Sequence, residues 1–506
     1  MTSSLPRLNR ELLAGLRNPD AGVVEIPSEK LLDLPEIAVQ FGTGALLRGF
    51  IEDFLHRANE QGLFGGRVVA IGSTGSTRDR ALNEQDGLYT LVVEGIERGE
   101  RIEQKRIISS LSRALSAVDE WDAVLALARS PELGFVFSNT TEVGIVADEQ
   151  SLFDDAPPKS FPAKLTRFLY ERAVAHDFSA SSGLVVIPCE LIESNGAKLR
   201  DMVLEIANRW KVDARFAEWI DAAVPFCNTL VDRIVPGFPR AEEAEALSVQ
   251  LGYSDEMMTC CEPYRLFAIE APAAVHAQLG WTAADEGIIV ASDIAPYRQR
   301  KVHLLNAPHT LLACVALPMG HETVRDAITD AALHKFLRGA MLDEIAPMLD
   351  VEGADTFADA VLDRFRNPFI RHALADITLQ GTMKMKVRVV PIVDRYIAQR
   401  GEVPQALAFG FAAFLAFMDG TFQSRRVAAG LAVPADNHAE RLRAAWCAAG
   451  SDVSALVRAV ASDVTLWDAD LTGLPGWCDA VAEQLGRIRS VGIAAALDQH
   501  LSSPVS

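Results

Sequence analysis

Three polar side chains interrupt an apolar stretch of the chain, and their types are those of a carbonyl-reduction site. Lys301, Asn306 and His309 lie in the segment KVHLLNAPHT at spacings of five and three residues. A lysine that is partly desolvated in a cleft has a lowered pKa and can exchange a proton with an alcohol or a ketone. An asparagine amide can polarise the same oxygen, and an imidazole can hold a neighbouring hydroxyl. Together the three groups predict acid–base catalysis of a carbonyl reduction.

One helix face can carry these three side chains. At about 100° per residue, Asn306 and His309 lie roughly 60° apart and Lys301 about 80° from His309, so all three can point into one cleft. A structural interpretation stays open. Lys301 can extend its ammonium group to solvent, while Asn306 and His309 can satisfy backbone groups near Pro308, which removes one hydrogen bond from a helix.

The chain that must position these residues changes character near residue 290. Its 506 residues exceed one typical core, so we expect two domains. From about Pro35 to Ile294, helical patterns alternate with short β-branched runs, namely EIAVQFG, GRVVAIGST, LGFVFSNT, GLVVIPCE and GIIVASD. Near-continuous apolar strands separated by helices predict a mostly parallel sheet covered on both faces. From Pro296 onward the pattern is helix after helix.

The first predicted strand leads into a glycine pair that is typical of dinucleotide binding. The apolar run ends at Phe41 and is followed by Gly42, Gly44 and an amphipathic pattern to about Ala58. Glycines between a strand and a helix let the backbone approach a pyrophosphate, whose charge is favoured at the helix N-terminus. The full fingerprint needs a third glycine, where this chain has Leu47. A plain strand–helix turn is therefore the competing interpretation.

The second predicted strand lacks the acidic residue that usually holds the ribose hydroxyls of NAD. It ends in Gly72, Ser73 and Thr74, with Arg78 and Arg80 shortly after. Arginines at this place can accept a 2′-phosphate, so NADP stays open as the cofactor, and solvated loop residues are the alternative for both arginines.

Composition and charge exclude several classes of protein. The net charge is −20 and no basic stripe is visible, so we expect no nucleic-acid partner. The N-terminus lacks a signal-peptide pattern. The longest apolar stretch, Ala406 to Met418, is short for a membrane span and suits a buried helix. The seven cysteines show no C-x-x-C spacing, which favours reduced thiols in a cytoplasm, and no His/Cys ligand spacing predicts a metal site.

The chain resembles one family of dehydrogenases. The spacing of lysine, asparagine and histidine in PYRQRKVHLLNAPH is similar to the K-x-x-x-x-N-x-x-H pattern of the mannitol dehydrogenase family of long-chain polyol and uronate dehydrogenases, where it opens a helical C-terminal domain. Within this family the chain is most similar to the enzymes that reduce keto-uronates. The supporting stretches lie between residues 40 and 391 and are QFGTGALLRGF, QDGLYT, FVFSNTTEVGI, DDAPPKSFPAKLTR, IPCELIESNG, LVDRIVPGFPR and RFRNPFIRH.

The resemblance implies a role for each polar residue of the opening segment. Lys301 would be the general acid/base, Asn306 would polarise the reacting oxygen, and His309 would contact a substrate hydroxyl. Asp232, in LVDRI, sits where the family lines its substrate pocket, and pairing with the neighbouring Arg233 is the alternative.

The resemblance also extends the predicted cofactor site. Asn139, in FSNTTE, follows a strand at the sheet edge that faces the nicotinamide in this family, and a simple turn residue is the alternative. With Phe41, Gly42 and Gly44 it makes up the predicted cofactor-binding set.

Two departures from the family bear on the substrate. Its polyol dehydrogenases have a second asparagine in a stretch resembling C-x-N-I, where PCELI places Leu191. They also carry an acidic residue three before the lysine, where this chain has Arg298. A guanidinium can clamp the carboxylate of a uronate, which a neutral polyol does not require. We therefore predict that Arg298 and Lys384, in GTMKMK, bind a carboxylate; surface charge is the alternative.

Taken with the resemblance, these patterns predict an oxidoreductase that reduces the ketone of a linear keto-uronate with NAD and without a metal. The predicted class is α/β, with a Rossmann-like dinucleotide-binding domain at residues 1–290 and a mainly helical substrate and catalytic domain at residues 291–506. We expect a cytoplasmic monomer whose partner is a sugar acid, without nucleic acid or membrane. The open alternatives are a fructuronate reductase, a mannitol- or arabinitol-type polyol dehydrogenase, and a non-redox epimerase or sensor.

Overall fold

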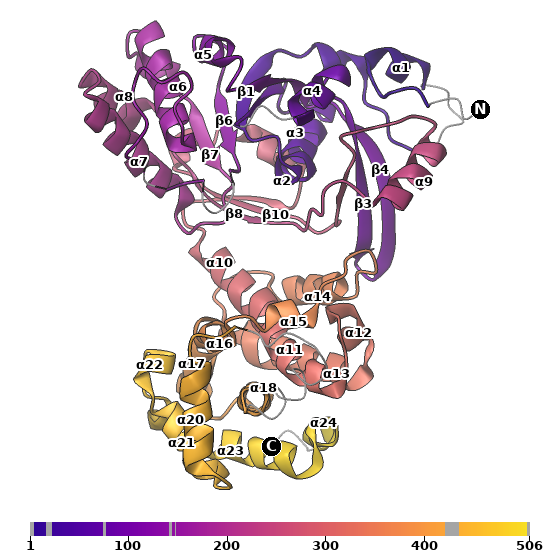
Figure 1. The fold of residues 1–506 in the computed structure, drawn as a ribbon, viewed down its shortest axis with the longest axis vertical. Helices are drawn as coiled ribbons and strands as arrows, with labels where there is room; N and C mark the ends of the chain where they lie inside the picture. Colours follow the sequence, from indigo (N-terminus) through magenta and orange to yellow (C-terminus); the bar gives the residue numbers. More distant parts are fainter. Residues whose placement is uncertain are drawn as a thin grey trace. The chain divides into compact units, whose positions relative to one another are not determined.

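The chain folds into two compact units in the computed structural model, which describes residues 5–16, 23–73, 77–140, 144–146, 148–419 and 435–502 (Figure 1). Unit 1 consists of Met1–Glu94 and Arg101–Ile294, and unit 2 of Gly95–Glu100 and Ala295–Ser506. The division at Ile294 lies four residues beyond the boundary drawn from the sequence.

The centre of unit 1 is a five-stranded parallel sheet with the strand order β5–β2–β1–β6–β7. Counted along the chain within this sheet, the order is 3-2-1-4-5, as in a Rossmann fold, and the winding reverses between β1 and β6. The predicted α/β class with a parallel N-terminal sheet is confirmed. The strands are β1 (Glu36–Phe41), β2 (Arg67–Gly72), β5 (Leu111–Ser116), β6 (Phe135–Ser138) and β7 (Val185–Pro188).

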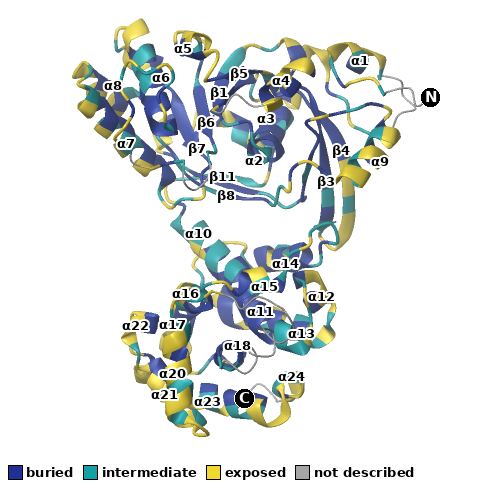
Figure 2. Ribbon diagram, in the orientation of Figure 1, coloured by how far each residue is buried: buried dark blue, intermediate teal, exposed yellow. Residues whose placement is uncertain are grey.

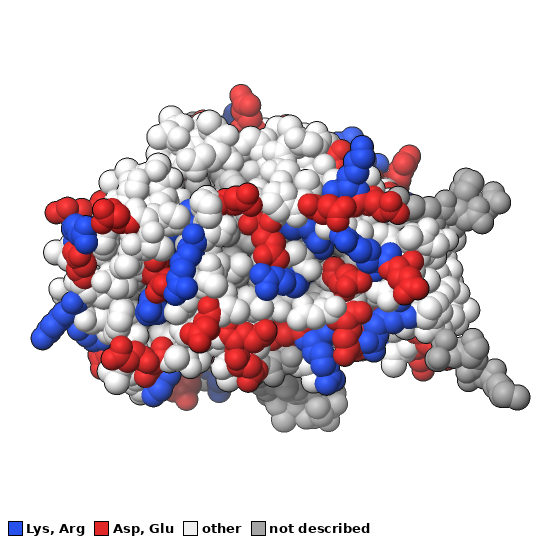
Figure 3. Space-filling view, turned by 90° about the horizontal axis from the view of Figure 1, so that it is seen from above, with Lys and Arg blue, Asp and Glu red and all other residues white. Residues whose placement is uncertain are grey.

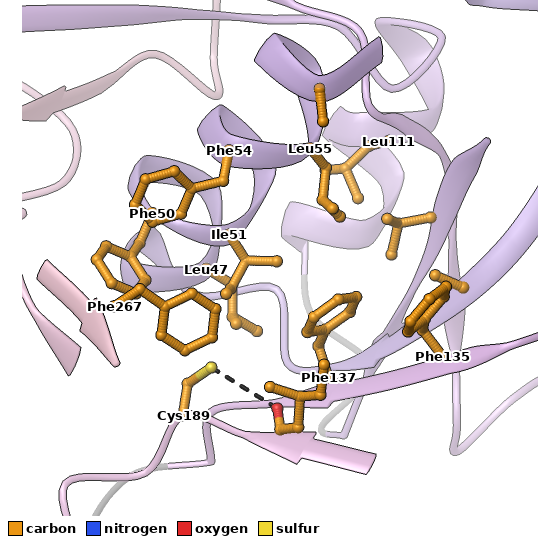
Figure 4. Close-up of a cluster of buried hydrophobic side chains, with 14 of the residues drawn as sticks. Leu47, Phe50, Ile51, Phe54, Leu55, Leu111, Phe135, Phe137, Cys189 and Phe267 are labelled. Atoms are coloured by element: carbon orange, nitrogen blue, oxygen red, sulfur yellow. Dashed lines mark hydrogen bonds between the residues drawn. The ribbon is translucent and has the colours of Figure 1, made fainter. Parts of the chain in front are cut away.

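Both faces of this sheet are buried under apolar clusters, and successive side chains of a strand point alternately into the one and the other. In β1, Ala38 belongs to the apolar cluster on one face and Val39 to the cluster on the other. Figure 4 shows the first cluster, where the rings of Phe50 and Phe54 lie 5.2 and 6.0 Å from that of Phe267. This double burial explains why the strands read as continuous apolar runs.

Helices cover the two faces of the parallel sheet. Helices α5 to α8 supply apolar side chains to one face, and α2, α3 and α4 supply them to the other. The helices of unit 1 are α1 (Arg10–Gly15), α2 (Ala45–Gly49), α3 (Ile51–Glu60), α4 (Thr77–Glu84), α5 (Trp121–Ala128), α6 (Phe161–Ala175), α7 (Asn195–Trp210), α8 (Arg215–Ala223) and α9 (Ala241–Leu251).

Two three-stranded sheets complete unit 1, with the orders β4–β3–β9 and β11–β10–β8. The segment GIIVASD, predicted to join the parallel sheet, instead forms β11 and pairs with β10, so that prediction is wrong in detail. Its short apolar run reads the same in either sheet. The strands are β3 (Tyr89–Glu97), β4 (Glu100–Ile108), β8 (Asn228–Asp232), β9 (Thr259–Cys261), β10 (Leu266–Glu270) and β11 (Ile288–Ala291).

Unit 2 is built from helices, as its sequence predicts. At its centre α11 and α18 are largely buried (Figure 2). They pack closely at Gly410, where the missing Cβ leaves room for the Leu311 side chain. A Cβ at Gly410 would lie 2.5 Å from that side chain. The helices are α10 (Ala295–Lys301), α11 (Ala307–Met319), α12 (Val324–Thr329), α13 (Ala331–Gly339), α14 (Ala354–Phe365), α15 (Leu374–Ile377), α16 (Gly381–Arg388), α17 (Val390–Arg400), α18 (Gln405–Phe417), α20 (Ala439–Ala449), α21 (Val453–Ala461), α22 (Val464–Trp467), α23 (Trp477–Val491) and α24 (Ile493–Ser502).

One helical stretch among the described residues, Ala295–Met319, is long and apolar enough to cross a membrane by length and composition alone. Its most apolar window has a mean hydropathy of 1.3, and 67% of that window is buried inside the protein. Such burial is typical of a core helix. The stretch singled out from the sequence forms the shorter helix α18, which is buried as expected.

Charged side chains of both signs are mixed on the face drawn in Figure 3, where Lys and Arg alternate with Asp and Glu over the described residues.

Glu52 in α3 is a carboxyl group enclosed in the core of unit 1. It is 0% exposed. Burial raises its pKa from 4.5 to about 8, against smaller lowering effects of Ser110 and Arg67. Glu52 is therefore largely protonated at pH 7 in the folded protein and ionised in the unfolded chain.

We predict that Glu52→Gln stabilises the protein at neutral and mildly alkaline pH. Because the folded-state pKa is raised, the contribution of Glu52 is fully present below pH 4.5 and is lost as the pH rises toward about 8. The amide does not ionise, so the variant should gain on the order of 3 kcal/mol in unfolding free energy at the upper end of this range. Thermal unfolding followed from pH 5 to pH 8.5 tests this, with the exposed Glu218→Gln in α8 as control. Parallel stability curves for wild type and variant would contradict it.

Candidate active site

A wide turn interrupts the helix that carries the three predicted catalytic residues. Between α10 and α11, Val302–Asn306 forms a π-helical turn, and the N–H of Ala307 donates to the carbonyl of Val302, five residues back. In a regular helix Lys301 and Asn306 would lie about 140° apart. Because a π turn closes after five residues, it brings these two positions back to the same side of the helix.

Exposure along this helix follows the predicted chemistry. Lys301, Asn306 and His309 are each half-buried, as is Val302, whereas the other residues from 303 to 310 are buried. The structure therefore brings the three predicted catalytic residues to the accessible part of an otherwise buried segment.

His309 is held as a neutral imidazole with a defined tautomer. Its Nδ1 lies 2.9 Å from the carbonyl oxygen of Leu305, and since a carbonyl only accepts, Nδ1 carries the proton and Nε2 is the acceptor. Burial holds the pKa of His309 well below its usual value, and the neighbouring His372 and the charges of Arg364 and Arg388 lower it further. One ring nitrogen thus satisfies the backbone, as the structural interpretation expected, and the other can accept from a hydroxyl.

Arg388, at the end of α16, fixes the backbone of the π turn. Its Nη1 donates to the carbonyl of Asn306 at 3.2 Å and to the Thr310 hydroxyl at 3.0 Å. The Nδ1 of His303 lies 2.8 Å from the carbonyl of Arg388, to which it donates. Burial lowers the pKa of Arg388 to about 10, so it stays charged at neutral pH. The sequence interpretation missed this residue, because four residues away Lys384 offered a cation with the same apparent role.

Lys384 belongs to the same positively charged region. Its Nζ donates to the carbonyl of Ile377 at 2.8 Å, and burial followed by the charge of Arg388 lowers its pKa. Its charge also lowers the pKa of His372, whose ring lies 4.9 Å from that of His309. We call Arg364, Lys384 and Arg388 the cationic cluster; the neutral ring of His372 lies beside it. Arg298 lies apart from these elements in the sequence, half-buried on α10.

In unit 1, the predicted cofactor residues meet where the winding of the sheet reverses. Gly42 has φ +122°, and a Cβ there would lie 2.9 Å from the backbone oxygen of Asn139. The N–H of Asn139 donates to the carbonyl of Phe41 at 3.1 Å, and its side-chain amide donates to the carbonyl of Cys189 at 2.7 Å. Asn139 therefore ties together the ends of β1, β6 and the residue after β7.

The other two members of the set differ in character. The ring of Phe41 packs in the core, 5.3 Å from Phe161 and 5.9 Å from Phe168, so only its backbone faces the sheet edge. Gly44 precedes α2 in extended conformation, and no atom lies within 4 Å of the place where its Cβ would be. That open space is compatible with a bound group close to the backbone.

The helix expected after the glycine pair is broken in two. Helix α2 ends at Gly49, Phe50 has φ −134° and ψ −77°, and α3 begins at Ile51. The buried guanidinium of Arg48 donates to the carbonyl of Thr43 and to the hydroxyl of Thr259. The turn is thus anchored by an arginine that the glycine fingerprint does not include.

Asp232 is the last residue of β8 and is 9% exposed. The fully buried guanidinium of Arg233, the neighbour considered as its partner from the sequence, pairs with Asp53 at 2.7 Å.

The place of the second asparagine is taken by Leu191, whose side chain is 57% exposed. Asn195, four residues on, is fully buried, and its amide nitrogen donates to the carbonyls of Pro188 and Glu190 and to the Thr229 hydroxyl. It is therefore a structural residue. Over the described parts of the chain, no three His, Cys, Asp or Glu side chains group as metal ligands.

Comparison with known proteins covers both units. The family model for the mannitol dehydrogenase Rossmann domain matches residues 36–283, and that for the mannitol dehydrogenase C-terminal domain matches residues 293–489. Altronate oxidoreductase of Bacillus subtilis (strain 168) is 41% identical over 466 residues, covering 92% of this chain and 95% of the relative. Altronate oxidoreductase of Pectobacterium atrosepticum is 40% identical over 473 residues, covering 92% of this chain and 96% of the relative.

Two solved structures share the fold. The ternary complex of Pseudomonas fluorescens mannitol 2-dehydrogenase with NAD and D-mannitol superposes with a TM-score of 0.65 at 24% identity, covering 98% of this chain and all of that one. A substrate-free D-sorbitol dehydrogenase reaches a TM-score of 0.78 at 22% identity, covering 97% of this chain and all of that one. With its Rossmann sheet, its helical second unit and both family models matched, the chain belongs to the mannitol dehydrogenase family.

Proposed function

We propose that the chain is an NAD-dependent oxidoreductase that interconverts D-tagaturonate, a keto-uronate, and D-altronate, the corresponding sugar acid. The observation that carries this proposal is the 41% identity to an altronate oxidoreductase over 92% of the chain. The half-buried Lys301, Asn306 and His309 on the π-interrupted helix support it, because their groups are those that a ketone reduction requires.

In the proposed reaction one domain binds the cofactor and the other binds the substrate. Residues 1–290 bind the dinucleotide at the sheet edge formed by Phe41, Gly42, Gly44 and Asn139, where the left-handed Gly42 and the open space at Gly44 suit a close approach. Residues 291–506 bind and protonate the substrate. When bound, the reduced nicotinamide supplies the hydride for the ketone carbon.

Three side chains of the second domain handle the rest of the chemistry. The Lys301 ammonium gives its proton to the oxygen of the reacting carbonyl as negative charge develops there. The Asn306 amide donates a hydrogen bond to the same oxygen and stabilises that charge. His309 accepts a hydrogen bond from a neighbouring substrate hydroxyl through Nε2, since its Nδ1 proton is committed to Leu305.

Cationic side chains of the same domain bind the carboxylate of the substrate. Lys384 lies in the cationic cluster, whose charge favours an anionic substrate over a neutral polyol. Arg298, one helical turn before Lys301, is the second proposed carboxylate-binding residue. Asp232 binds a substrate hydroxyl or orients Lys301. In the cell we propose a cytoplasmic monomer without nucleic-acid or membrane partners.

Lys301→Ala should lower the rate of NADH oxidation with tagaturonate by about 100- to 10,000-fold, because general acid catalysis is lost. The measurement offers tagaturonate, fructuronate and fructose in parallel, each with NADH and NADPH. Lys386→Ala is the matched control, since this lysine lies on α16 and pairs with Asp468 at 2.8 Å. Activity that survives the Lys301 variant would remove the catalytic assignment, and preference for fructose would move the chain to the polyol branch.

Lys384→Met and Arg298→Ala should each raise KM for tagaturonate by about 10- to 100-fold, the effect of losing one charge-assisted hydrogen bond. The KM for fructose, which has no carboxylate, should change much less in both variants. Steady-state kinetics with the two substrates separate these effects. Equal weakening of the uronate and the neutral sugar would show that the two cations do not bind the carboxylate.

A further inference from the structure

The carboxyl end of β2 is the place where a Rossmann domain reads the adenosine ribose of its cofactor. In this chain the strand ends at Gly72, and no acidic residue stands at the strand end itself. The structure nevertheless places a carboxylate there, from the helix that follows.

That carboxylate belongs to Asp79, in the first turn of α4, whose side chain folds back onto Gly72. A Cβ at Gly72 would lie 2.2 Å from Oδ2 and 2.5 Å from Oδ1 of Asp79. The acid therefore occupies the space in which a side chain of residue 72 would stand. Asp79 is 5% exposed, so its position is fixed by packing. The Asp79 carboxylate can lie there only because residue 72 is a glycine.

A cavity of about 400 Å³ opens beside Asp79. It lies at the ends of the adjacent strands β2 and β5, because Ser116, the last residue of β5, also lines it. Its lining carries four carboxylates and one guanidinium, those of Asp79, Glu84, Asp119, Glu120 and Arg80. A cavity of this size and place suits the ribose of a dinucleotide.

The charges around this cavity are unfavourable to a phosphate. Arg80, considered from the sequence as a receptor for the 2′-phosphate of NADP, lies 3.6 Å from Glu84, and both side chains are exposed. Arg78 is exposed as well. A dianionic phosphate would meet an excess of negative charge here, whereas a hydroxyl can donate to a carboxylate.

We propose that Asp79 is the residue that selects NAD over NADP: it accepts a hydrogen bond from the ribose 2′-hydroxyl and repels a 2′-phosphate. The inference rests on the proposed function in one respect, namely that unit 1 binds a nicotinamide dinucleotide. It assigns to a helix residue the role that the strand end leaves vacant, and it makes Gly72 a positioning residue.

The test measures binding without substrate. Isothermal titration of the full chain with NADH, NADPH, 5′-AMP and 2′,5′-ADP gives the ratio of affinities for the unphosphorylated and the 2′-phosphorylated ligand. We expect about a 100-fold preference for NADH and for 5′-AMP in the wild type, from one hydrogen bond and one repulsion. Asp79→Asn, which keeps the shape and removes the charge, and Asp79→Ala should both reduce this preference to about fivefold or less. Asp201→Asn, an exposed aspartate on α7, is the matched control.

Gly72→Ala gives an independent readout of the packing. Its methyl group would take the place of the Asp79 carboxylate, so this variant should lose the preference as Asp79→Ala does, and the double variant should lose no more than either single one. Wild-type binding of NADH with an unchanged preference in folded Asp79→Asn and Asp79→Ala would overturn the inference alone. No binding of either dinucleotide by the wild type would overturn the proposed function, and the inference with it.

Discussion

The π turn at Val302–Asn306 is the constraint on which the candidate active site of unit 2 depends. Such turns are rare inside α-helices and persist where their surroundings hold them. Here Arg388 donates to the carbonyl of Asn306, and His303 donates to the carbonyl of Arg388. The end of α16 is thus bonded to the turn from both sides. The same element carries Lys384, so one helix both shapes the candidate catalytic segment and contributes to the positive charge around it.

In unit 1, two glycines without a Cβ let polar groups come close to the end of the parallel sheet. At Gly42 the absent Cβ lets the backbone of Asn139 approach, and at Gly72 it admits the carboxylate of Asp79. Gly42 follows β1 and Gly72 ends the neighbouring β2, at the edge of the parallel sheet where Rossmann domains bind ligands. The sheet is the rigid frame, and the missing Cβ atoms of Gly42 and Gly72 determine which groups can approach its end.

Elements with a short repeating pattern of apolar residues could be predicted from the sequence. Contacts between segments far apart in the sequence could not. The pattern of apolar residues predicts the helical second half of the chain and the strands β1, β2, β6 and β7. Strand β5, LSRALS, does not, because it lies at the edge of the sheet and carries an arginine paired with Glu36. The lysine, asparagine and histidine of the candidate site were predicted from their types and spacing. Three other features depend on tertiary packing, which no local pattern encodes. They are the π turn that brings Lys301 and Asn306 to one side, the hydrogen bonds of Arg388, and the contact of the Asp79 side chain with Gly72.

The β3–β4 hairpin contributes residues to both units. Its tip, Gly95–Glu100, belongs to unit 2, so the chain passes between the units at 94/95, 100/101 and 294/295. There the N–H of Gly99 donates to the buried carboxylate of Asp363 at 2.9 Å, across 264 residues. During synthesis this tip leaves the ribosome long before the helices that receive it, and closing so long a loop is slow. The second unit is therefore not a module that can be moved to another protein by cutting once at residue 294, because part of its own structure is encoded two hundred residues earlier.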